Sequence, residues 1–167
     1  LSSVLVKGKT DGSGIKVTTY NITYCTTGMY QNALATAGIE DAEIVVAGPY
    51  NISGTAALVG AIKSYENMTG ETVSQENVDT ATNELVVTGK LAESVGDSDK
   101  AEQLVGAVKE QVVEGSDNGK KLTEEEIGNV VDQAAQEMDV QLSDEDRQEI
   151  VDLMDKIKGL DIDVDSL

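Results

Sequence analysis

The chain has 167 residues, which suits one compact domain or two small ones, and its formal net charge is −19. A surface this acidic repels phosphate backbones and anionic membranes, so nucleic acid is not an expected partner. Histidine is absent and Cys25 is the only cysteine, which excludes an imidazole base, His/Cys zinc sites and intramolecular disulfides.

Two β-rich runs open the chain, at Ser3–Lys9 and Ile15–Tyr24, on either side of a glycine-containing turn over 10–14. This spacing predicts a β-hairpin. In the second run neither face is purely apolar, because polar and apolar side chains occur at both alternating sets of positions. We therefore expect one face of the hairpin to be partly exposed, or covered by a segment that this chain lacks.

A helix, a short strand and a second helix are predicted next. Thr27 is placed to cap the first helix, and Gly38 to end it in a left-handed conformation. The strand covers Glu43–Ala47. Ser53 is placed to cap the second helix, whose apolar stripe ends before Gly70. This alternation favours helices packed on a small sheet.

The remainder of the chain has helical periodicity. A long helix from Ser74 to about Gly96 is followed by a helix that Ser98 caps, and the loop over 115–119 is the best linker candidate. The segments 122–138 and 142–158 each open with Leu, a hydroxyl residue and, three positions later, an acid. This pattern predicts two capped helices that form an antiparallel hairpin.

Together these elements predict an α+β fold, in which an N-terminal β-hairpin and a third short strand pack with helices. A helical C-terminal half then ends in the antiparallel helical hairpin. We place an α+β domain at 1–96 and a helical region at 97–167, either separate or packed on the first as one unit. No apolar run reaches the ~18 residues that a membrane span needs, so no transmembrane segment is predicted.

Acidic residues gather at two predicted helix starts and in the C-terminal tail. Glu124–Glu126 and Asp144–Asp146 complement the positive end of a helix dipole, so their placement indicates capping more than acid/base catalysis. Asp161, Asp163 and Asp165 alternate as at the start of a calcium loop, but the glycine that such a loop requires next is absent. They are weak candidates for a metal site, and the sequence predicts no cofactor.

Four residues in the first half are candidates for ligand binding, namely Tyr30, Asn32, Ser53 and Thr55. Tyr30 is amphipathic and Asn32 carries an amide, but nearby helix positions point in different directions. Ser53 and Thr55, at a predicted helix start, could hold an anion through free backbone N–H groups, although capping alone explains the serine. No phosphate-binding glycine motif occurs, so nucleotide binding has no support.

The longest motif is T-x-x-x-Y-Q-N-A-x-x-T-A-G-I-x-x-A-x-I-x-V-A over Thr26–Ala47, followed by S-G-x-x-A-L-x-G-x-x-K over Ser53–Lys63. With these motifs the chain resembles the uncharacterised family called domain of unknown function 1002. The resemblance implies a secreted or cell-envelope protein of a Gram-positive bacterium, with a signal peptide and an upstream segment ahead of the first strands. It supplies no catalytic residues.

Three functional hypotheses follow. The first is a non-enzymatic extracellular or cell-envelope binding or interaction module, whose partner is an envelope component or the upstream segment. The second is a small-molecule or cation-binding domain that uses the Ser53 region or the acidic C-terminal segment. The third is a hydrolase in which a Ser, Thr or Asp acts with Lys63 or Lys90, since such pairs need no histidine.

Overall fold

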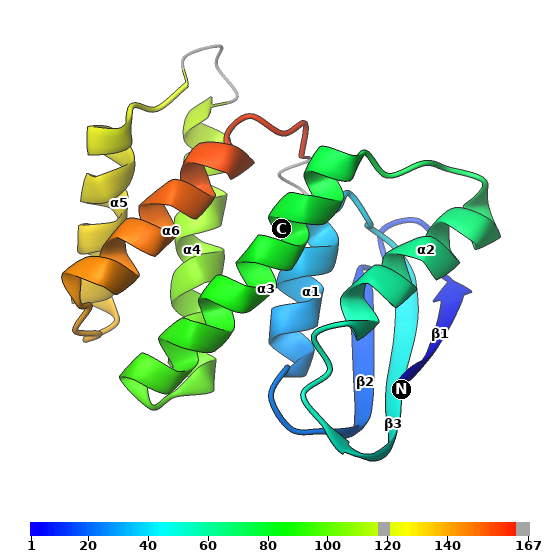
Figure 1. The fold of residues 1–167 in the computed structure, drawn as a ribbon. Helices are drawn as coiled ribbons and strands as arrows, with labels where there is room; N and C mark the ends of the chain where they lie inside the picture. The colour runs from blue at the N-terminus through cyan, green and yellow to red at the C-terminus, as the bar shows by residue number, and fades with distance from the viewer. Residues whose placement is uncertain (117–120, 163–167) are drawn as a thin grey trace. The chain divides into compact units, whose positions relative to one another are not determined.

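The structure is a computed structural model that describes residues 1–116 and 121–162. Its elements, drawn in Figure 1, are β1 (Ser3–Gly8), β2 (Ile15–Ile22), α1 (Thr27–Thr36), β3 (Ala42–Ile52), α2 (Ala57–Thr69), α3 (Gln75–Val95), α4 (Ser98–Ser116), α5 (Glu124–Glu137) and α6 (Asp144–Ile157). A three-stranded mixed sheet at the N-terminus precedes a helical C-terminal half. This arrangement confirms the α+β fold class.

The chain divides into two compact units after Val86, within α3. The domain boundary predicted after residue 96 lies at the C-terminal end of the same helix. The first half of α3 therefore belongs to the unit that contains the sheet, and its second half belongs to the helical unit.

The predicted N-terminal β-hairpin is wrong, because β1 and β2 do not pair with each other. The strand order is β1-β3-β2, with β3 antiparallel to β1 and parallel to β2. β3 carries the most buried side chains of the three strands, including Ala42, Ile44 and Val46. The central position suits such a strand, since both of its edges are then hydrogen-bonded and one of its faces is fully covered.

The glycine-containing segment over 10–14 is a turn, but it connects two strands that lie on opposite sides of β3. Asp41, just before β3, holds this segment in place: its two carboxylate oxygens accept the backbone N–H groups of Gly12 and Gly14 at 3.0 and 2.8 Å. Both glycines have positive φ, 79° and 70°. The turn residues were therefore recognised correctly in the sequence, whereas the strand partner was not.

β3 is also longer than predicted, because it continues through Pro49 to Ile52. The pairing with β2 becomes irregular between Tyr20 and Ile22, where Asn21 has a φ of 55°. The Asn21 side chain donates a hydrogen bond to the Gly48 carbonyl at 2.9 Å. Pro49, which has no N–H to donate, lies in the part of β3 where this ladder is interrupted.

Among the described residues of the first unit, α1 and α2 cover the same face of the sheet. α1 packs on β2 and α2 packs on β1, over a core that contains Ile44 and Val46 (Figure 1). On the other face the strand register places Leu5, Tyr20 and Val45 together, and Leu5 and Tyr20 are 52% and 59% exposed. The expectation of a partly exposed sheet face is thus confirmed for the described residues.

The first half of α3 is fastened to α1 through polar groups. The Thr36 hydroxyl, at the end of α1, is hydrogen-bonded to the carboxylate of Glu84, and both side chains are fully buried. About two helical turns before Glu84, Asn77 donates its amide to the Thr36 carbonyl at 3.2 Å. Because a buried carboxylate needs hydrogen bonds to offset its lost hydration, Glu84 specifies how these two helices meet.

The predicted ends of α1 and α2 are confirmed, while three of the predicted helix starts shift. Gly38 and Gly70 adopt the left-handed conformation, with φ of 84° and 77°. The cap of α1 is Thr26, whose hydroxyl accepts the Met29 N–H at 3.2 Å, and not Thr27. Adjacent threonines offer the same chemistry, so only the backbone geometry distinguishes them.

The same one-residue ambiguity affects α4, where Asp97 and not Ser98 accepts the N–H of Lys100, at 3.0 Å. The error is larger at α2. Ser53 does not cap this helix, because α2 begins at Ala57 and its N-cap, Ala56, makes no side-chain hydrogen bond. The longer β3 uses the residues up to Ile52, which moves the helix start further along the chain.

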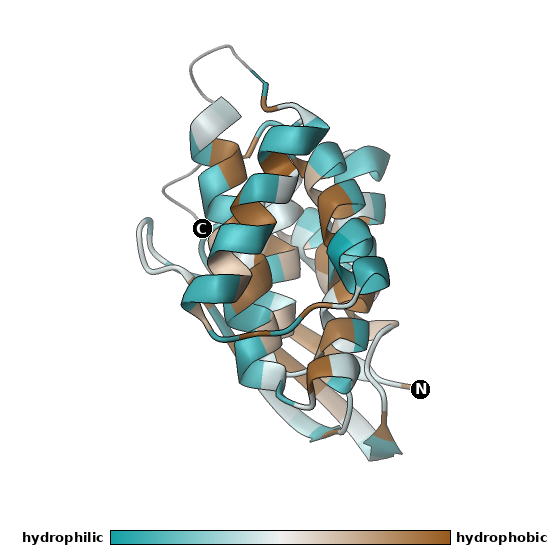
Figure 2. Cartoon of the chain, turned by 90° about the vertical axis from the view of Figure 1, so that its left-hand side faces the viewer, coloured by the Kyte–Doolittle hydropathy of each residue, from teal (hydrophilic) through white to brown (hydrophobic). Residues whose placement is uncertain are grey.

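The second unit has a core of aliphatic side chains from α4, α5 and α6. Leu104 and Val108 from α4, Ile127 from α5, and Ile150 and Leu153 from α6 are all completely buried. Figure 2 shows apolar residues on the sides by which these helices face one another and hydrophilic residues on their outer sides. α5 and α6 are consecutive, pack on each other and run in opposite senses, as predicted.

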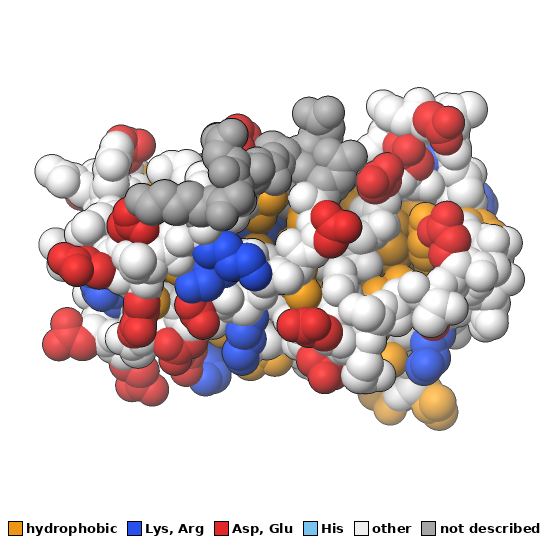
Figure 3. Space-filling view, turned by 90° about the horizontal axis from the view of Figure 1, so that it is seen from above, with side chains coloured by type: hydrophobic (Ala, Val, Ile, Leu, Met, Phe, Trp, Pro, Cys, Tyr) orange, Lys and Arg blue, Asp and Glu red, His pale blue; other side chains and the backbone are white. Residues whose placement is uncertain are grey.

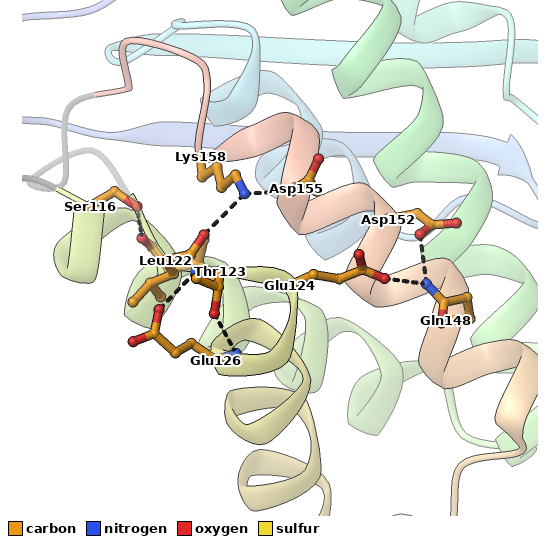
Figure 4. Close-up of polar contacts among 10 residues, drawn as sticks. Ser116, Leu122, Thr123, Glu124, Glu126, Gln148, Asp152, Asp155 and Lys158 are labelled. Atoms are coloured by element: carbon orange, nitrogen blue, oxygen red, sulfur yellow. Dashed lines mark hydrogen bonds and ion pairs between the residues drawn. The ribbon is translucent and has the colours of Figure 1, made fainter. Parts of the chain in front are cut away.

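Thr123 and Ser143 cap α5 and α6, as the sequence predicts. At α5 the cap is a complete capping box: the Thr123 hydroxyl accepts the Glu126 N–H at 3.2 Å, and the Glu126 carboxylate accepts the Thr123 N–H at 2.8 Å. Lys158, just after α6, reaches back to the Leu122 carbonyl at 3.0 Å (Figure 4). The start of α5 and the end of α6 are therefore held together.

Replacing Thr123 by alanine is expected to destabilise the helical unit by about 1 kcal/mol, because the Glu126 N–H loses its acceptor. Thr123→Ser keeps the hydroxyl, so its free energy of unfolding should fall by at most a few tenths of the decrease caused by alanine. Urea denaturation followed by circular dichroism measures both variants. Equal destabilisation by serine and alanine would contradict the capping role.

The hydrogen bonds from Gly14 and Gly12 lower the pKa of Asp41. A lowered folded-state pKa contributes stability above the unfolded-state pKa, ~3.9, and this contribution is lost as the pH falls through the folded value. Asp41→Asn should therefore be less stable than the parent chain at neutral pH, and the difference should shrink as the pH falls below ~3.9 and through the lowered pKa of folded Asp41.

Asp11→Asn is the matched control for this pH dependence, because Asp11 lies in the same turn and makes no hydrogen bond within the described residues. Urea denaturation at several pH values measures all three proteins. If the difference in the free energy of unfolding between the parent chain and Asp41→Asn stays constant from neutral to acidic pH, the charge of the Asp41 carboxylate does not contribute to stability.

Candidate functional site

The carboxyl ends of β2 and β3 lie at the same edge of the sheet, because the two strands are parallel. α1 and α2 follow these ends directly in the chain. In parallel sheets this edge is the usual place for ligands. Three of the four predicted ligand-binding residues, Tyr30, Ser53 and Thr55, lie here.

Tyr30 joins the two connections at this edge. Its hydroxyl donates a hydrogen bond of 2.5 Å to the Gly54 carbonyl, and its side chain is 1% exposed. In the same place the Cys25 N–H donates to the Ser53 carbonyl at 3.1 Å. Tyr30 is therefore a buried anchor, and its ring is not available to a ligand from solvent.

Cys25 lies beside Tyr30 and is buried as well. Burial raises the pKa of the Cys25 thiol, and a hydrogen bond with Tyr30 offsets this only in part. Burial also raises the pKa of Tyr30, with a smaller contribution from Cys25. Both groups thus stay protonated at neutral pH, which suits packing and not nucleophilic attack.

The other predicted candidates do not converge on one point. Ser53 is exposed and Thr55 is half-buried in the connection before α2. Asn32 is half-buried on α1, two positions after Tyr30, and so projects from a different side of the helix. Ligand binding by these residues stays a prediction.

Only one of the three predicted metal-binding candidates lies within the described residues. Asp161 is exposed near the end of the described residues, and Asp163 and Asp165 lie outside them. Within residues 1–116 and 121–162, no group of three or more Cys, Asp or Glu side chains is placed to hold a metal ion.

The two lysines named for a hydrolase have different surroundings. Lys90 Nζ lies 2.6 Å from Glu149 Oε1, as an ion pair. Lys63 is exposed and forms no hydrogen bond or ion pair within the described part of the chain. At Lys63 the structure therefore contains no hydroxyl–lysine hydrogen bond of the kind that the hydrolase hypothesis needs.

The first unit contains a cavity of about 390 Å³ between α2, the connection over 70–74 and the first half of α3. Its lining residues are Val59, Ile62, Lys63, Glu66, Val73, Gln75, Val78, Asp79 and Thr82. Small-molecule sites have volumes of ~300–1,000 Å³ and combine an apolar lining with a few polar groups. The cavity matches this description, at the lower end of the size range.

Hydrogen bonds hold several polar groups of the lining. Glu66 Oε1 accepts the Val73 N–H at 2.9 Å, which fastens the connection to α2. Asp79 Oδ1 accepts the Gln75 amide at 2.8 Å, and the Thr82 hydroxyl donates to the Val78 carbonyl at 2.8 Å. The cavity wall is thus largely pre-organised.

The cavity was not predicted from the sequence, in which Lys63 is a candidate for a different chemistry. Helical periodicity indicates which side of each helix is apolar, but it does not indicate that two such sides leave a gap. One sequence feature near the cavity could be recognised, namely Gly70, which ends α2 in a left-handed conformation with φ of 77°. A sharp turn of this kind brings the end of one helix close to the start of the next.

The surface around these features is strongly acidic. The chain has 31 acidic and 12 basic residues. Figure 3 shows acidic side chains spread widely over one face, with fewer basic ones among them.

The family described as "Protein of unknown function (DUF1002)" matches the chain over residues 1–167. The chain belongs to this family. A curated relative, named "Uncharacterized protein YpuA" from Bacillus subtilis (strain 168), is 40% identical over 162 residues. No solved structure matches the chain.

This DUF1002 chain spans about half the length of that relative: the matched region covers 97% of the chain and 54% of the relative. The family assignment confirms the resemblance seen in the sequence. Among the described residues, no helix is both long enough and apolar enough to cross a membrane.

In this DUF1002 chain, Gly54 is expected to be essential for packing at the edge of the sheet. A Cβ at Gly54 would lie 2.4 Å from the Tyr30 hydroxyl and 2.6 Å from Ile22 Cγ2, whereas a Cβ at Gly70 would meet nothing within 4 Å. Both glycines have positive φ, so both alanine variants carry the same backbone penalty of ~1–2 kcal/mol.

Gly54→Ala should therefore be less stable than Gly70→Ala by about 1–3 kcal/mol, the usual cost of overpacking a core. Urea denaturation of the two variants measures this difference directly. Similar stabilities would mean that Tyr30 and Ile22 move aside easily and do not fix the edge.

Proposed function

We propose that this chain is a non-enzymatic binding module and that the cavity between α2 and α3 is its binding site. The observation that carries the proposal is the combination in one cavity of an aliphatic lining with a small number of charged groups. Ile62 is buried, and Val59, Val73 and Val78 are half-buried, so an apolar part of a ligand would displace water from aliphatic surface.

The polar lining favours binding over catalysis. The Thr82 hydroxyl donates its hydrogen bond to a backbone carbonyl of its own helix, and Lys63 makes no hydrogen bond within the described residues. No nucleophile in the lining is therefore activated by a neighbouring base, which covalent catalysis without histidine requires. The charged groups instead can orient a bound molecule.

The proposed location is extracellular or in the cell envelope of a Gram-positive bacterium. The resemblance to the family suggests this location, and the Bacillus source of the relative supports the kind of organism. Because the chain covers only 54% of that relative, the proposed binding activity refers to this part of the protein.

Methyl-detected NMR of the whole chain tests the proposal, with a panel of aliphatic amines, carboxylates, alcohols and amino acids as probes. At least one class is expected to shift the methyl signals of Ile62, Val59, Val73 and Val78 in a saturable way. Saturable shifts confined to other parts of the chain, or no shift with any probe at millimolar concentration, would refute the cavity as a binding site.

Val78→Phe is expected to fill the cavity and remove the saturable shifts, because the larger ring occupies space that a ligand needs. Met68→Phe is the matched control, since Met68 is exposed on α2 and is not part of the lining. Urea denaturation shows whether each variant is folded, and Val73→Phe replaces Val78→Phe if that variant is not. Unchanged binding in a folded, filled variant would place the ligand elsewhere.

A further inference from the structure

We propose that the cavity between α2 and α3 binds a small zwitterion with an aliphatic body, such as a free amino acid or a short peptide. This inference rests on the proposed binding function and names the ligand class for the same cavity. Three features carry it: charges of both signs in the lining, the availability of those charges, and the aliphatic character of the remaining surface.

The lining carries one ammonium group and two carboxylates. Lys63 and Glu66 lie three residues apart on α2, so they project from the same side of that helix. Asp79 projects from α3, the helix that forms the other wall. A ligand in the cavity therefore meets a cation on one helix and carboxylates on both.

These charges do not neutralise one another. Lys63 forms no ion pair with Glu66, Asp79 or any other described residue, since its nitrogen lies more than 4.0 Å from every described carboxylate. Glu66 and Asp79 each use one oxygen, to accept the Val73 N–H and the Gln75 amide respectively. The second oxygen of each carboxylate makes no hydrogen bond within the described residues.

The pattern of available groups selects among charged ligands. A ligand carboxylate pairs with Lys63, but an anion without a positive group faces two carboxylates nearby. A ligand ammonium pairs with Glu66 or Asp79, but a cation without a negative group leaves Lys63 without a partner. A zwitterion satisfies both kinds of group at once, and charge-assisted hydrogen bonds are the stronger ones.

The rest of the lining is aliphatic, from Val59, Ile62, Val73 and Val78, and contains no aromatic side chain. Branched aliphatic groups of a ligand pack against such residues without needing a polar partner. The volume of about 390 Å³ holds a single small molecule and not a long chain. Leucine-like ligands combine this body with both charges.

Isothermal titration calorimetry of the whole chain compares three probes that share one aliphatic body. L-leucine carries both charges, 3-methylbutylamine lacks the carboxylate, and 4-methylpentanoate lacks the ammonium. L-leucine is expected to bind at least about tenfold more tightly than either analogue, since each analogue loses one charged hydrogen-bonded contact. L-leucylglycine, in which the two charges lie further apart, distinguishes a free amino acid from a short peptide as the source of the zwitterion.

Two sets of variants assign the contacts. Lys63→Met should abolish the preference for L-leucine over 3-methylbutylamine. The double variant Glu66→Gln, Asp79→Asn should abolish the preference over 4-methylpentanoate, while its amide oxygens still accept the Val73 and Gln75 hydrogen bonds. Lys16→Met and Glu76→Gln are the matched controls, since both residues are exposed and neither lines the cavity.

Zwitterion selectivity is refuted if either single-charge analogue binds as tightly as both L-leucine and L-leucylglycine, or if the controls change the preference as much as the lining variants. If an analogue binds and Val78→Phe abolishes that binding, the proposed function stands and only the ligand class is wrong. If none of the four probes binds, the zwitterion inference fails, and the wider NMR panel decides whether the cavity binds anything.

Discussion

β3 is hydrogen-bonded on both edges, and the layout of the first unit depends on this central position. Because β3 separates β1 from β2, the segment over 10–14 must cross the end of β3, where Asp41 holds it. α1 must then carry the chain from β2 to the parallel β3 over one face of the sheet. α2 follows on the same face and packs on β1.

The cavity is a consequence of what comes after α2. The left-handed turn at Gly70 reverses the chain, and the Glu66 carboxylate fixes the connection through the Val73 N–H. α3 is fastened to α1 through Thr36, Glu84 and Asn77. The cavity lies where α2 and the first half of α3 face each other, and its lining includes the buried Ile62 as well as the exposed Lys63 and Asp79.

Charge has two separate roles in this molecule. Most of the 31 acidic residues are solvated, and those in the first turns of α5 and α6 complement the positive ends of these helices. Lys63, Glu66 and Asp79 differ because they border the aliphatic lining of the cavity. The total charge gives no indication of this local arrangement, since only three residues are involved.

Several helix ends, two helix starts and the buried sides of the last three helices could be predicted from the sequence alone. Gly38 and Gly70 end helices, Thr123 and Ser143 begin them, and the apolar stripes of α4, α5 and α6 are buried as their periodicity indicates. Each of these features depends on interactions within a few residues, so composition and spacing are enough to predict it.

Neither the strand order nor the cavity between α2 and α3 could be predicted from the sequence. Neighbouring β-rich runs indicate a hairpin, but the more buried β3 lies between β1 and β2, and no pattern within a few residues indicates this order. The cavity depends on packing between side chains of α2, the connection over 70–74 and the first half of α3. Lys63 was visible in the sequence, whereas its position opposite Asp79 follows from long-range packing.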